Sequence, residues 1–345
     1  MQDRPYTENF FKGIQQGSYR SAKEIVPLVL ELVQPRSVID IGCGTGNWLS
    51  VFKEFGIEEI FGVDGDYVSE KILKIPKERF LSFDLKRPFH LGRQFDLVLS
   101  LEVAEHLPPE SASTFIDSLT GHGNVVLFSA ATPHQGGTQH LNEQWPEYWL
   151  EHFQHRGYVV IDCIRKRVWK NPNVEWWYAQ NVLMFVQRDH LDARPLLRRE
   201  FENTAISQLS IIHPRKYLDS VDWVARLYLA VRDIATVIPE EDAFILLDDE
   251  HFGGLLTAGR RTIPFLDREG QYGGRPPNDE TAIQEIERLR RLGANFIVLA
   301  WPAFWWLDHY GVFNRYLRSN FPCALDNERI VVFDMRPNSN PLSSL

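Results

Sequence analysis

A glycine-rich loop that directly follows an apolar run is the feature that most constrains the fold of this chain. Residues 38–46 read VIDIGCGTG, and a stretch with helical character continues from 47 to 55. A buried strand that passes through a glycine turn into a helix is typical of an open α/β sheet, in which ligands bind against such a turn. The sequence therefore predicts an α/β domain whose ligand touches the backbone of this loop.

Short apolar runs alternate with helical stretches from residue 19 to residue 188, which indicates a mostly parallel sheet with helices on both faces. Seven strands fit in this part of the chain, at 38–41, 60–63, 80–83, 95–100, 124–129, 158–162 and 181–187. Helices are expected at 22–33, 47–55, 67–74, 112–119 and 147–155. The first half of the chain therefore predicts one seven-stranded domain.

The second half of the chain shows a separate pattern. Lys216 is the last lysine, and beyond a helix at 217–237 we expect strands at 243–247, 295–299 and 330–334, with helices at 280–292 and 303–319. Two glycine-containing loops, 247–254 and 267–277, are interpreted as surface turns, with a ligand site at either loop as the alternative. We therefore predict three parts, which are a domain at 1–188, a helical connector at 189–240 and a second, smaller α/β domain at 241–345.

Charge and cysteine content limit the partners and the compartment. The 345 residues include 37 Lys and Arg against 46 Asp and Glu, a formal charge of −9. Because duplex nucleic acid is bound mainly through its phosphates, an acidic chain with no stripe of cations is a poor candidate for it. The widely spaced Cys43, Cys163 and Cys323 favour reduced thiols, and the longest apolar run, 296–307, is about half a membrane span. We expect a cytoplasmic protein without a nucleic acid partner or a membrane span.

Asp40 indicates which ligand fits the glycine loop. A nicotinamide dinucleotide site needs the spacing G-x-G-x-x-G, and counting from Gly42 the third glycine would fall at Asn47. The carboxylate of Asp40 lies at the start of the loop, where it would repel a diphosphate and attract an ammonium group. The expected ligand is therefore cationic at that end.

These residues resemble the first motif of the class I S-adenosylmethionine-dependent methyltransferases, an acidic residue followed by GxGxG. Further segments match in order within residues 19–188, namely GVD at 62–64, FDL at 83–85 and the run at 95–107. The resemblance implies a Rossmann-like methyltransferase sheet and S-adenosyl-L-methionine as cofactor, with Asp64 on the ribose hydroxyls. The donor-binding residues that it implies are Asp40, Gly42, Cys43, Gly44, Gly46, Asp64, Asp84, Leu85, Ser100 and Glu102.

Three titratable residues follow the predicted fourth strand. Glu102, Glu105 and His106 stand at i, i+3 and i+4, so on a helix they would share one face beside the donor. Methyl transfer to a hydroxyl needs a proton acceptor, and because histidine titrates near neutrality, His106 is the preferred general base. Glu105 and His140 are the other expected catalytic residues.

The E-x-x-E-H spacing at 102–106 also resembles the metal-binding segment of ubiquinone-pathway O-methyltransferases and small-RNA 2′-O-methyltransferases, in which a further histidine follows strand five. Here His134 and His140 stand in that region. The resemblance implies a divalent metal ion with the ligands Glu102, Glu105, His106 and His140. The alternative is that Glu105 and His106 cap a helix or contact each other without a metal.

Aromatic residues concentrate where this fold would cover the acceptor. Five of the ten tryptophans lie between Trp145 and Trp177, and the segments 136–145 and 175–181 look like parts of bacterial methyltransferases of glycan or glycolipid assembly. Flat aromatic faces beside amides suit a sugar ring, although the same rings could form core. We therefore predict O-methylation of a hydroxyl on a sugar, glycan or glycosylated small molecule, by in-line transfer.

Other functions stay open at this point. They are metal-assisted O-methylation of a quinone-like or catechol-like small molecule, RNA 2′-O-methylation, which the net charge opposes, and donor binding without catalysis. Residues 263–334 resemble an accessory domain fused to bacterial glycosyltransferases and methyltransferases, for which we expect a binding or assembly role. A second copy of the chain is a further candidate partner.

Overall fold

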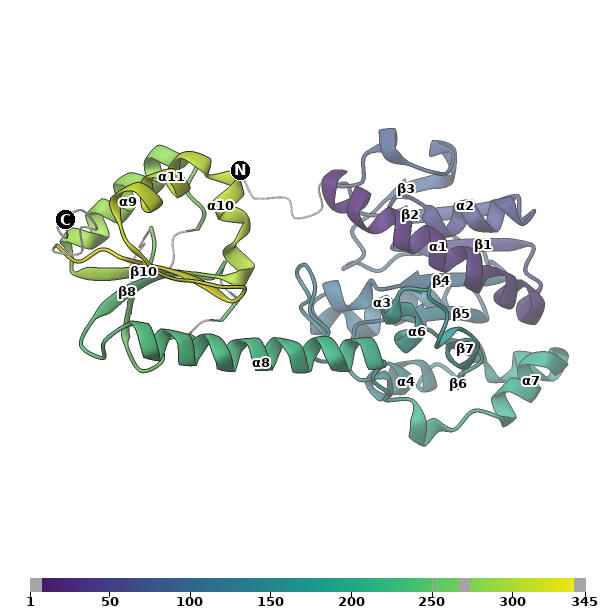
Figure 1. Ribbon diagram of the computed structural model, residues 1–345. Coiled ribbons are helices and arrows are strands. Elements are labelled where there is room, and N and C mark those ends of the chain that lie inside the picture. The colour runs from purple at the N-terminus through teal and green to yellow at the C-terminus, as the bar shows by residue number, and fades with distance from the viewer. Residues whose placement is uncertain (1–7, 250, 253, 267–273, 338–345) are drawn as a thin grey trace. The chain divides into compact units, whose positions relative to one another are not determined.

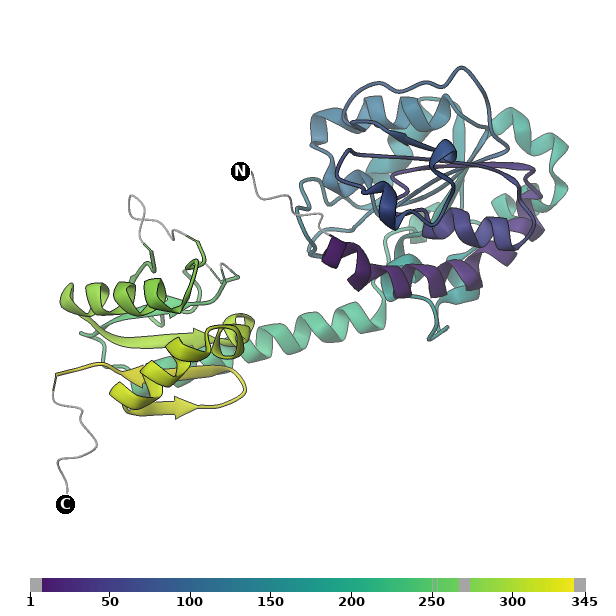
Figure 2. The same cartoon turned by 90° about the horizontal axis from the view of Figure 1, so that it is seen from above.

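The computed structural model describes residues 8–249, 251–252, 254–266 and 274–337, with side chains from residue 16 onward. The chain divides into two compact units, Met1–Tyr217 and Leu218–Leu345, which are treated separately below (Figures 1 and 2). Both units are α/β, as expected. Part of each loop that was interpreted as a surface turn, 247–254 and 267–277, lies outside the described residues.

The first unit is built on a seven-stranded sheet with the order β3-β2-β1-β4-β5-β7-β6. The first five strands in this order, from β3 through β2, β1 and β4 to β5, are parallel to one another. Strand β7 runs antiparallel to both β5 and β6. The strands are β1 Ser37–Ile41, β2 Glu59–Asp64, β3 Phe80–Ser82, β4 Leu97–Leu101, β5 Val125–Ser129, β6 Tyr158–Ile161 and β7 Leu183–Gln187. The prediction of a seven-stranded sheet is confirmed.

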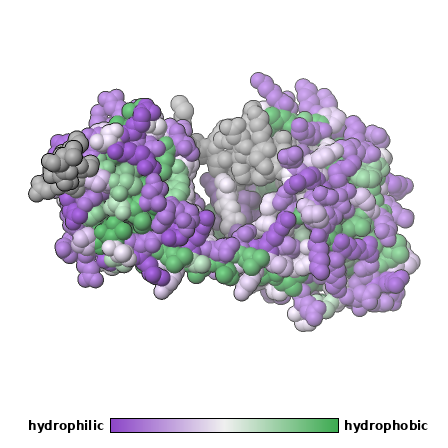
Figure 3. Space-filling model, viewed as in Figure 1, coloured by the Kyte–Doolittle hydropathy of each residue, from purple (hydrophilic) through white to green (hydrophobic). Residues whose placement is uncertain are grey.

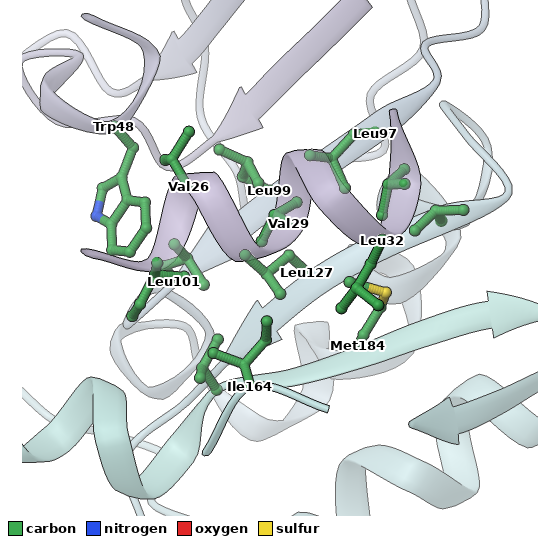
Figure 4. Packing of buried hydrophobic residues seen from close by; sticks show 14 of the residues in the cluster. Val26, Val29, Leu32, Trp48, Leu97, Leu99, Leu101, Leu127, Ile164 and Met184 are labelled. Carbon is green, nitrogen blue, oxygen red and sulfur yellow. The ribbon is translucent and has the colours of Figure 1, made fainter. Parts of the chain in front are cut away.

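Helices cover both faces of this sheet because side chains alternate along each strand. Leu97 and Leu99 of β4 pack on the face that carries α1 and α2, and Figure 4 shows them against Val26 and Val29. Val98 belongs to the opposite face, where α3 and α4 pack. The helices of this unit are α1 Glu8–Val33, α2 Asn47–Glu54, α3 Ala112–Thr120, α4 Pro146–Gln154, α5 Arg165–Val168, α6 Trp176–Asn181 and α7 Pro195–Glu202.

One predicted helix of the first unit is wrong. The segment 67–74 contains only a single 3-10 turn, Glu70–Ile72. The side chain of Ser69 accepts a hydrogen bond from the amide of Lys71, which favours a tight turn, and Pro76 follows shortly after. Further 3-10 turns lie at Lys77–Arg79, Ala104–His106, Pro109–Ser111, Arg188–Ala193, Ile206–Gln208 and Trp301–Ala303.

The second unit has a five-stranded mixed sheet with the order β11-β12-β10-β8-β9. Its strands are β8 Ala243–Leu247, β9 Arg261–Ile263, β10 Ala294–Ala300, β11 Cys323–Asp326 and β12 Ile330–Asp334. Helix α8, Pro214–Val237, spans the boundary of the units, and α9 Asp279–Arg291, α10 Trp305–His309 and α11 Gly311–Asn320 follow. The short edge strands β9 and β11 were not predicted, and the helix expected at 303–319 is interrupted at Tyr310. None of the described helices combines the length and apolarity needed to cross a membrane.

Candidate functional site

The glycine loop joins β1 to α2 in a conformation that other residues would disturb. Gly42, Gly44 and Gly46 have φ of 95°, 53° and 83°, in the left-handed region that glycine tolerates best. A Cβ placed on Gly42 would lie 2.3 Å from Cγ2 of Val103, the residue that follows the β4 exit. The backbone of the loop therefore lies directly against the β4 side of the site.

Asp64, the last residue of β2, holds this loop in place. Its carboxylate accepts hydrogen bonds from the amide of Gly44 at 2.6 Å, from the amide of Gly65 at 2.6 Å and from the hydroxyl of Tyr67. Burial raises the pKa of Asp64, and these three hydrogen bonds oppose the rise. Part of the carboxylate that was expected to receive ribose hydroxyls is therefore bound by the protein itself.

Asp40 lies in β1 and is only 2 % exposed. Burial, followed by the nearby negative charge of Asp64, raises the pKa of Asp40 to about 8. An ionised carboxylate at this depth is costly without a positive partner. A ligand that brings an ammonium group would supply that partner.

These residues line one cavity of about 1340 Å³ at the carboxyl ends of β1, β2 and β4. Of the predicted site residues, those on its lining are Asp40, Gly42, Cys43, Gly44, Asp64, Asp84, Leu85, Glu102, Glu105, His106 and His140. Gly46 and Ser100 are not on it: Gly46 precedes α2 and packs beside Ile75, and Ser100 is buried within β4. The cavity therefore brings together the predicted donor and catalytic residues.

The sequence placed Glu102 on a helix with Glu105 and His106, and the structure corrects this. Glu102 has φ of 56°, and only Ala104–His106 form a 3-10 turn after it. The amide of Glu102 donates to the carbonyl of Ser129 on β5, so the chain turns before any helix begins. The carboxylate of Glu102 consequently does not share a helical face with the other two side chains, although its charge still acts on Glu105.

Two amide side chains bind the carboxylate of Glu102, and neither was among the predicted site residues. Gln135 Nε2 donates to Glu102 Oε2 at 2.8 Å, and Asn181 Nδ2 donates to Oε1 at 3.1 Å. Gln180 in turn donates to Asn181 Oδ1 and accepts from the amide of His213, just before α8. Of these residues, only those of the segment 175–181 carried a sequence signal, because an asparagine and a glutamine stand there beside the tryptophans.

Glu105, His106 and His140 form a compact cluster, with potential ligand atoms within 4.8 Å of one another. Glu105 is fully buried, and neither of its carboxylate oxygens has a hydrogen-bond partner among the described residues. Burial and then the charge of Glu102 raise its pKa well above the ordinary value. Within the described chain, neither Glu102 nor the exposed His134 belongs to this cluster.

The two histidines of the cluster meet edge to face, with ring centroids 4.8 Å apart. Burial and then the proximity of His140 lower the pKa of His106 to about 4, so the expectation that His106 titrates near neutrality is wrong. His140 is oriented by Glu143, whose carboxylate lies 2.7 Å from Nδ1 and also accepts from the amide of Gly136. At neutral pH, His106 is therefore a neutral imidazole that can accept a proton or bind a metal ion.

An aromatic wall completes the cavity. Trp176, Trp177 and Tyr178 of α6 line it together with Trp48 of α2. Other aromatic residues from the predicted acceptor side lie elsewhere: Trp149 is 2 % exposed in the core, and Trp169 packs against His213. Only some of the aromatic residues from the predicted acceptor side therefore line the cavity.

Comparisons with known proteins find one matching family model and several similar solved structures. Residues 14–171 match the family model described as a methyltransferase domain. A search of curated proteins finds no match. Similar solved structures include DesVI of Streptomyces venezuelae (16 % identity, 52 % of this chain and 95 % of that chain, TM-score 0.38) and the sugar N-methyltransferase KedS8 of a Streptoalloteichus species (16 %, 52 % and 92 %, 0.41).

A third is the magnesium protoporphyrin IX methyltransferase of Synechocystis with bound S-adenosylhomocysteine (18 % identity, 53 % of this chain and 89 % of that chain, TM-score 0.39). At these identities the structures indicate no substrate for the present chain. The family match, by contrast, covers the glycine loop, β4 and the cluster that contains His140. Residues 14–171 are therefore a methyltransferase domain, and the enzyme that contains it uses S-adenosylmethionine as its methyl donor.

Proposed function

We propose that the enzyme methylates a hydroxyl group of a sugar, a glycan or a glycosylated small molecule. The observation that carries this proposal is that the aromatic wall of α6 and the Glu105, His106 and His140 cluster line the same cavity as the donor loop. Sugar rings pack well on flat aromatic faces, and a hydroxyl acceptor needs a proton acceptor close to the transferred methyl group.

The charge of the cavity lining supports an acceptor without phosphate groups near the reacting hydroxyl. Lys86 is the one lysine or arginine among the described lining residues, whereas the acidic ones are Asp40, Asp64, Asp66, Asp84, Glu102 and Glu105. An acidic lining attracts the positively charged donor and repels anionic acceptors. The same lining argues against RNA, whose backbone phosphates would need cationic partners.

For the donor, we propose that Asp40 binds the ammonium group and that Asp64 receives the ribose hydroxyls. A buried carboxylate such as Asp40, whose pKa is raised by burial and by a second acid, fits a cation, and Gly42 leaves room where a side chain would collide with Val103. We place Asp84 and Leu85 at the adenine end, as the resemblance implies. When bound, the donor supplies an electrophilic methyl group, and the protein aligns it with the acceptor oxygen.

For the proton, we propose that the two histidines of the cluster act together. His106 is neutral at physiological pH, and Glu143 fixes His140 through Nδ1, which leaves Nε2 of His140 for the cavity side. A Cβ on Gly137 would lie 2.2 Å from that Nε2, so the loop keeps a glycine where the ring needs space. Burial and the charge of Glu102 raise the pKa of Glu105 and so favour its uncharged form, and we propose that it contributes a hydrogen bond and not a charge.

Metal-assisted methyl transfer is a second candidate, and one observation favours it. The buried carboxylate of Glu105 has no hydrogen-bond partner among the described residues, and two imidazoles lie within reach of it. One carboxylate and two imidazoles suit a divalent transition metal, which would polarise an acceptor hydroxyl. Glu105, His106 and His140 would then be the ligands, while Glu102, held by Gln135 and Asn181, would lie outside that set.

The acceptor class can be tested with radiolabelled methyl donor and a panel of acceptors. The panel pairs neutral glycosides and oligosaccharides with catechols and quinone precursors, and each reaction is run with and without a chelator. Methyl transfer to the glycosides that survives chelation supports the primary proposal. Transfer confined to the catechols and quinone precursors overturns the sugar proposal, and loss of that transfer with the chelator supports the metal-assisted candidate.

The assignment of functions to the three parts of the chain is also a proposal. We propose that residues 1–188 carry donor binding and methyl transfer, that 189–240 connect, and that 241–345 form an accessory binding or assembly domain. Deletion of the chain after Ile238 tests this directly. The truncated protein should retain its affinity for S-adenosylhomocysteine and lose acceptor affinity.

A further inference from the structure

Helix α8 has two apolar faces, and the core of the second unit packs on only one of them. Ala230 and Ile234 are fully buried and belong to the hydrophobic core of the second unit, together with the partly buried Trp223 and Leu227. These four residues follow helical spacing and define the packed face of the helix. They account for the attachment of α8 to the second unit.

The other face is a stripe of large apolar side chains that are exposed to solvent. We call it the α8 stripe; its residues and exposed fractions are Tyr217 61 %, Leu218 57 %, Val221 46 %, Val224 60 %, Tyr228 64 % and Leu229 36 %. These six account for more than a third of the 16 exposed large hydrophobic residues in the described chain. Figure 3 shows apolar residues along this helix. Such a concentration on a single helix marks an interaction surface.

The order of residues in the α8 stripe is symmetric. Tyr217, Val221, Val224 and Tyr228 stand at i, i+4, i+7 and i+11, which is the spacing of a coiled-coil seam. Read in either direction, this seam is Tyr, Val, Val, Tyr, with its midpoint between residues 222 and 223. A surface with this symmetry is complementary to itself when two copies meet about a two-fold axis.

We propose that the α8 stripe binds α8 of a second copy of this chain in antiparallel orientation. In this register Val221 packs against the partner's Val224, and Tyr217 packs against the partner's Tyr228. No charged side chain belongs to the seam, since Asp219, Asp222 and Arg226 occupy other positions around the helix. The six side chains would bury roughly 600 Å² per protomer, which is in the lower range of stable dimer interfaces.

The mass of the full-length protein in solution, measured by light scattering after size exclusion, tests this proposal. The wild type should be a dimer at micromolar concentrations, with twice the 40.1 kDa of the chain. Val221→Lys and Val224→Asp should each give a monomer, because each places a charge in an apolar seam. Leu292→Lys, a change of the same kind at a site that is 60 % exposed on the second unit, should leave the dimer intact.

A mixture of the two monomeric variants fixes the orientation. In the antiparallel register the lysine introduced at position 221 of one variant faces the aspartate introduced at position 224 of the other. The mixture should therefore recover a dimer that neither variant forms alone. In a parallel pair these positions do not meet, and a mixture that stays monomeric overturns the proposal. A monomeric wild type also overturns it; if Val224→Asp then lowers its melting temperature, the stripe is covered within one chain. Neither result depends on the acceptor or on catalysis.

Discussion

The two units of this protein differ in how their most deeply buried acidic groups are paired. In the first unit, Asp40 and Glu105 are almost fully buried, and neither forms an ion pair with a lysine or arginine among the described residues. In the second unit, the less exposed carboxylates are paired: Glu285 with Arg288, Asp249 with Arg275 and Asp334 with Arg336. Paired groups stabilise a fold, whereas unpaired ones are tolerated where a ligand completes them. The contrast locates the chemistry in the first unit.

The same contrast applies to the carboxyl ends of the central strands. β1 ends in a glycine loop whose amide of Gly44 is held by Asp64, and a cavity opens beside it. β8 ends at Asp248 and Asp249, where Asp248 accepts from the amide of Phe252 and Asp249 binds Arg275 in a bidentate pair that also stacks on Trp305. The acids that follow β8 are therefore bound by protein groups, whereas the buried Asp40 of β1 has no ion pair among the described residues.

The largest effect should come from closing the donor loop. Gly42→Ala places a methyl group 2.3 Å from Val103 and forces alanine into φ of 95°. Affinity for S-adenosylhomocysteine, measured by calorimetry, should fall by about 100-fold or more, because relief of the clash moves the loop backbone into the space that the ligand would occupy. Gly56→Ala is the matched control: φ is 92° there, but no atom lies within 4 Å of the added Cβ. A Gly42→Ala protein that binds like Gly56→Ala would place the donor elsewhere.

The next effect should come from Asp40→Asn, which removes the proposed partner of the ammonium group. Affinity for S-adenosylhomocysteine should fall by about 10- to 100-fold, the usual cost of losing a charge-assisted hydrogen bond. The ligand-free protein should at the same time become more stable at neutral pH, on the order of 2 kcal/mol, because folding no longer has to keep a carboxyl group protonated at a pH where the unfolded chain ionises it. Chemical denaturation at pH 7 measures the second effect. Loss of both affinity and stability would indicate a structural role instead.

The pH dependence of donor binding sharpens this point. The folded-state pKa of Asp40 is about 8, above its unfolded value, so in the free enzyme its carboxyl group is mostly protonated below that pH. An ammonium group binds the ionised form, and binding therefore releases a proton. Affinity for S-adenosylhomocysteine should rise about tenfold from pH 6 to pH 7 and level off above pH 8. Calorimetry in buffers of different ionisation enthalpy detects the proton, and Asp40→Asn should abolish the slope.

The sequence was a good guide where local pattern and fold agree. Apolar runs located the seven strands of the first sheet, and the glycine spacing with Asp40 located the cavity, because a β1 residue and its following loop are adjacent in both sequence and space. Short edge strands such as β9 and β11 were missed since they bury little apolar surface. The break at Tyr310 was missed because aromatic residues continue across it.

The residues after β4 show why the rest of the candidate site could not be predicted from the sequence. The positive φ of Glu102 leaves no trace in the sequence, because glutamate rarely adopts it and the contacts of Ser129, Gln135 and Asn181 stabilise it here. The role of Gln135 depends on a loop that folds back over β4. The low pKa of His106 depends on burial, which spacing alone does not report. Each of these properties is set by tertiary contacts.

The smallest effect should come from the second unit, and it tests the comparison from the other side. Asp249→Asn removes the charge that Arg275 binds, yet asparagine tolerates the φ of 53° at this position. Because Arg275 is 60 % exposed, the loss of unfolding free energy should stay at or below about 1 kcal/mol. Affinity for S-adenosylhomocysteine should not change. The substitutions Asp40→Asn and Asp249→Asn would then shift the free energy of unfolding in opposite directions. This is expected if Asp40 gains its positive partner only from a ligand, whereas Asp249 already pairs with Arg275. A measurable loss of donor affinity in Asp249→Asn would show that the second unit takes part in the donor site.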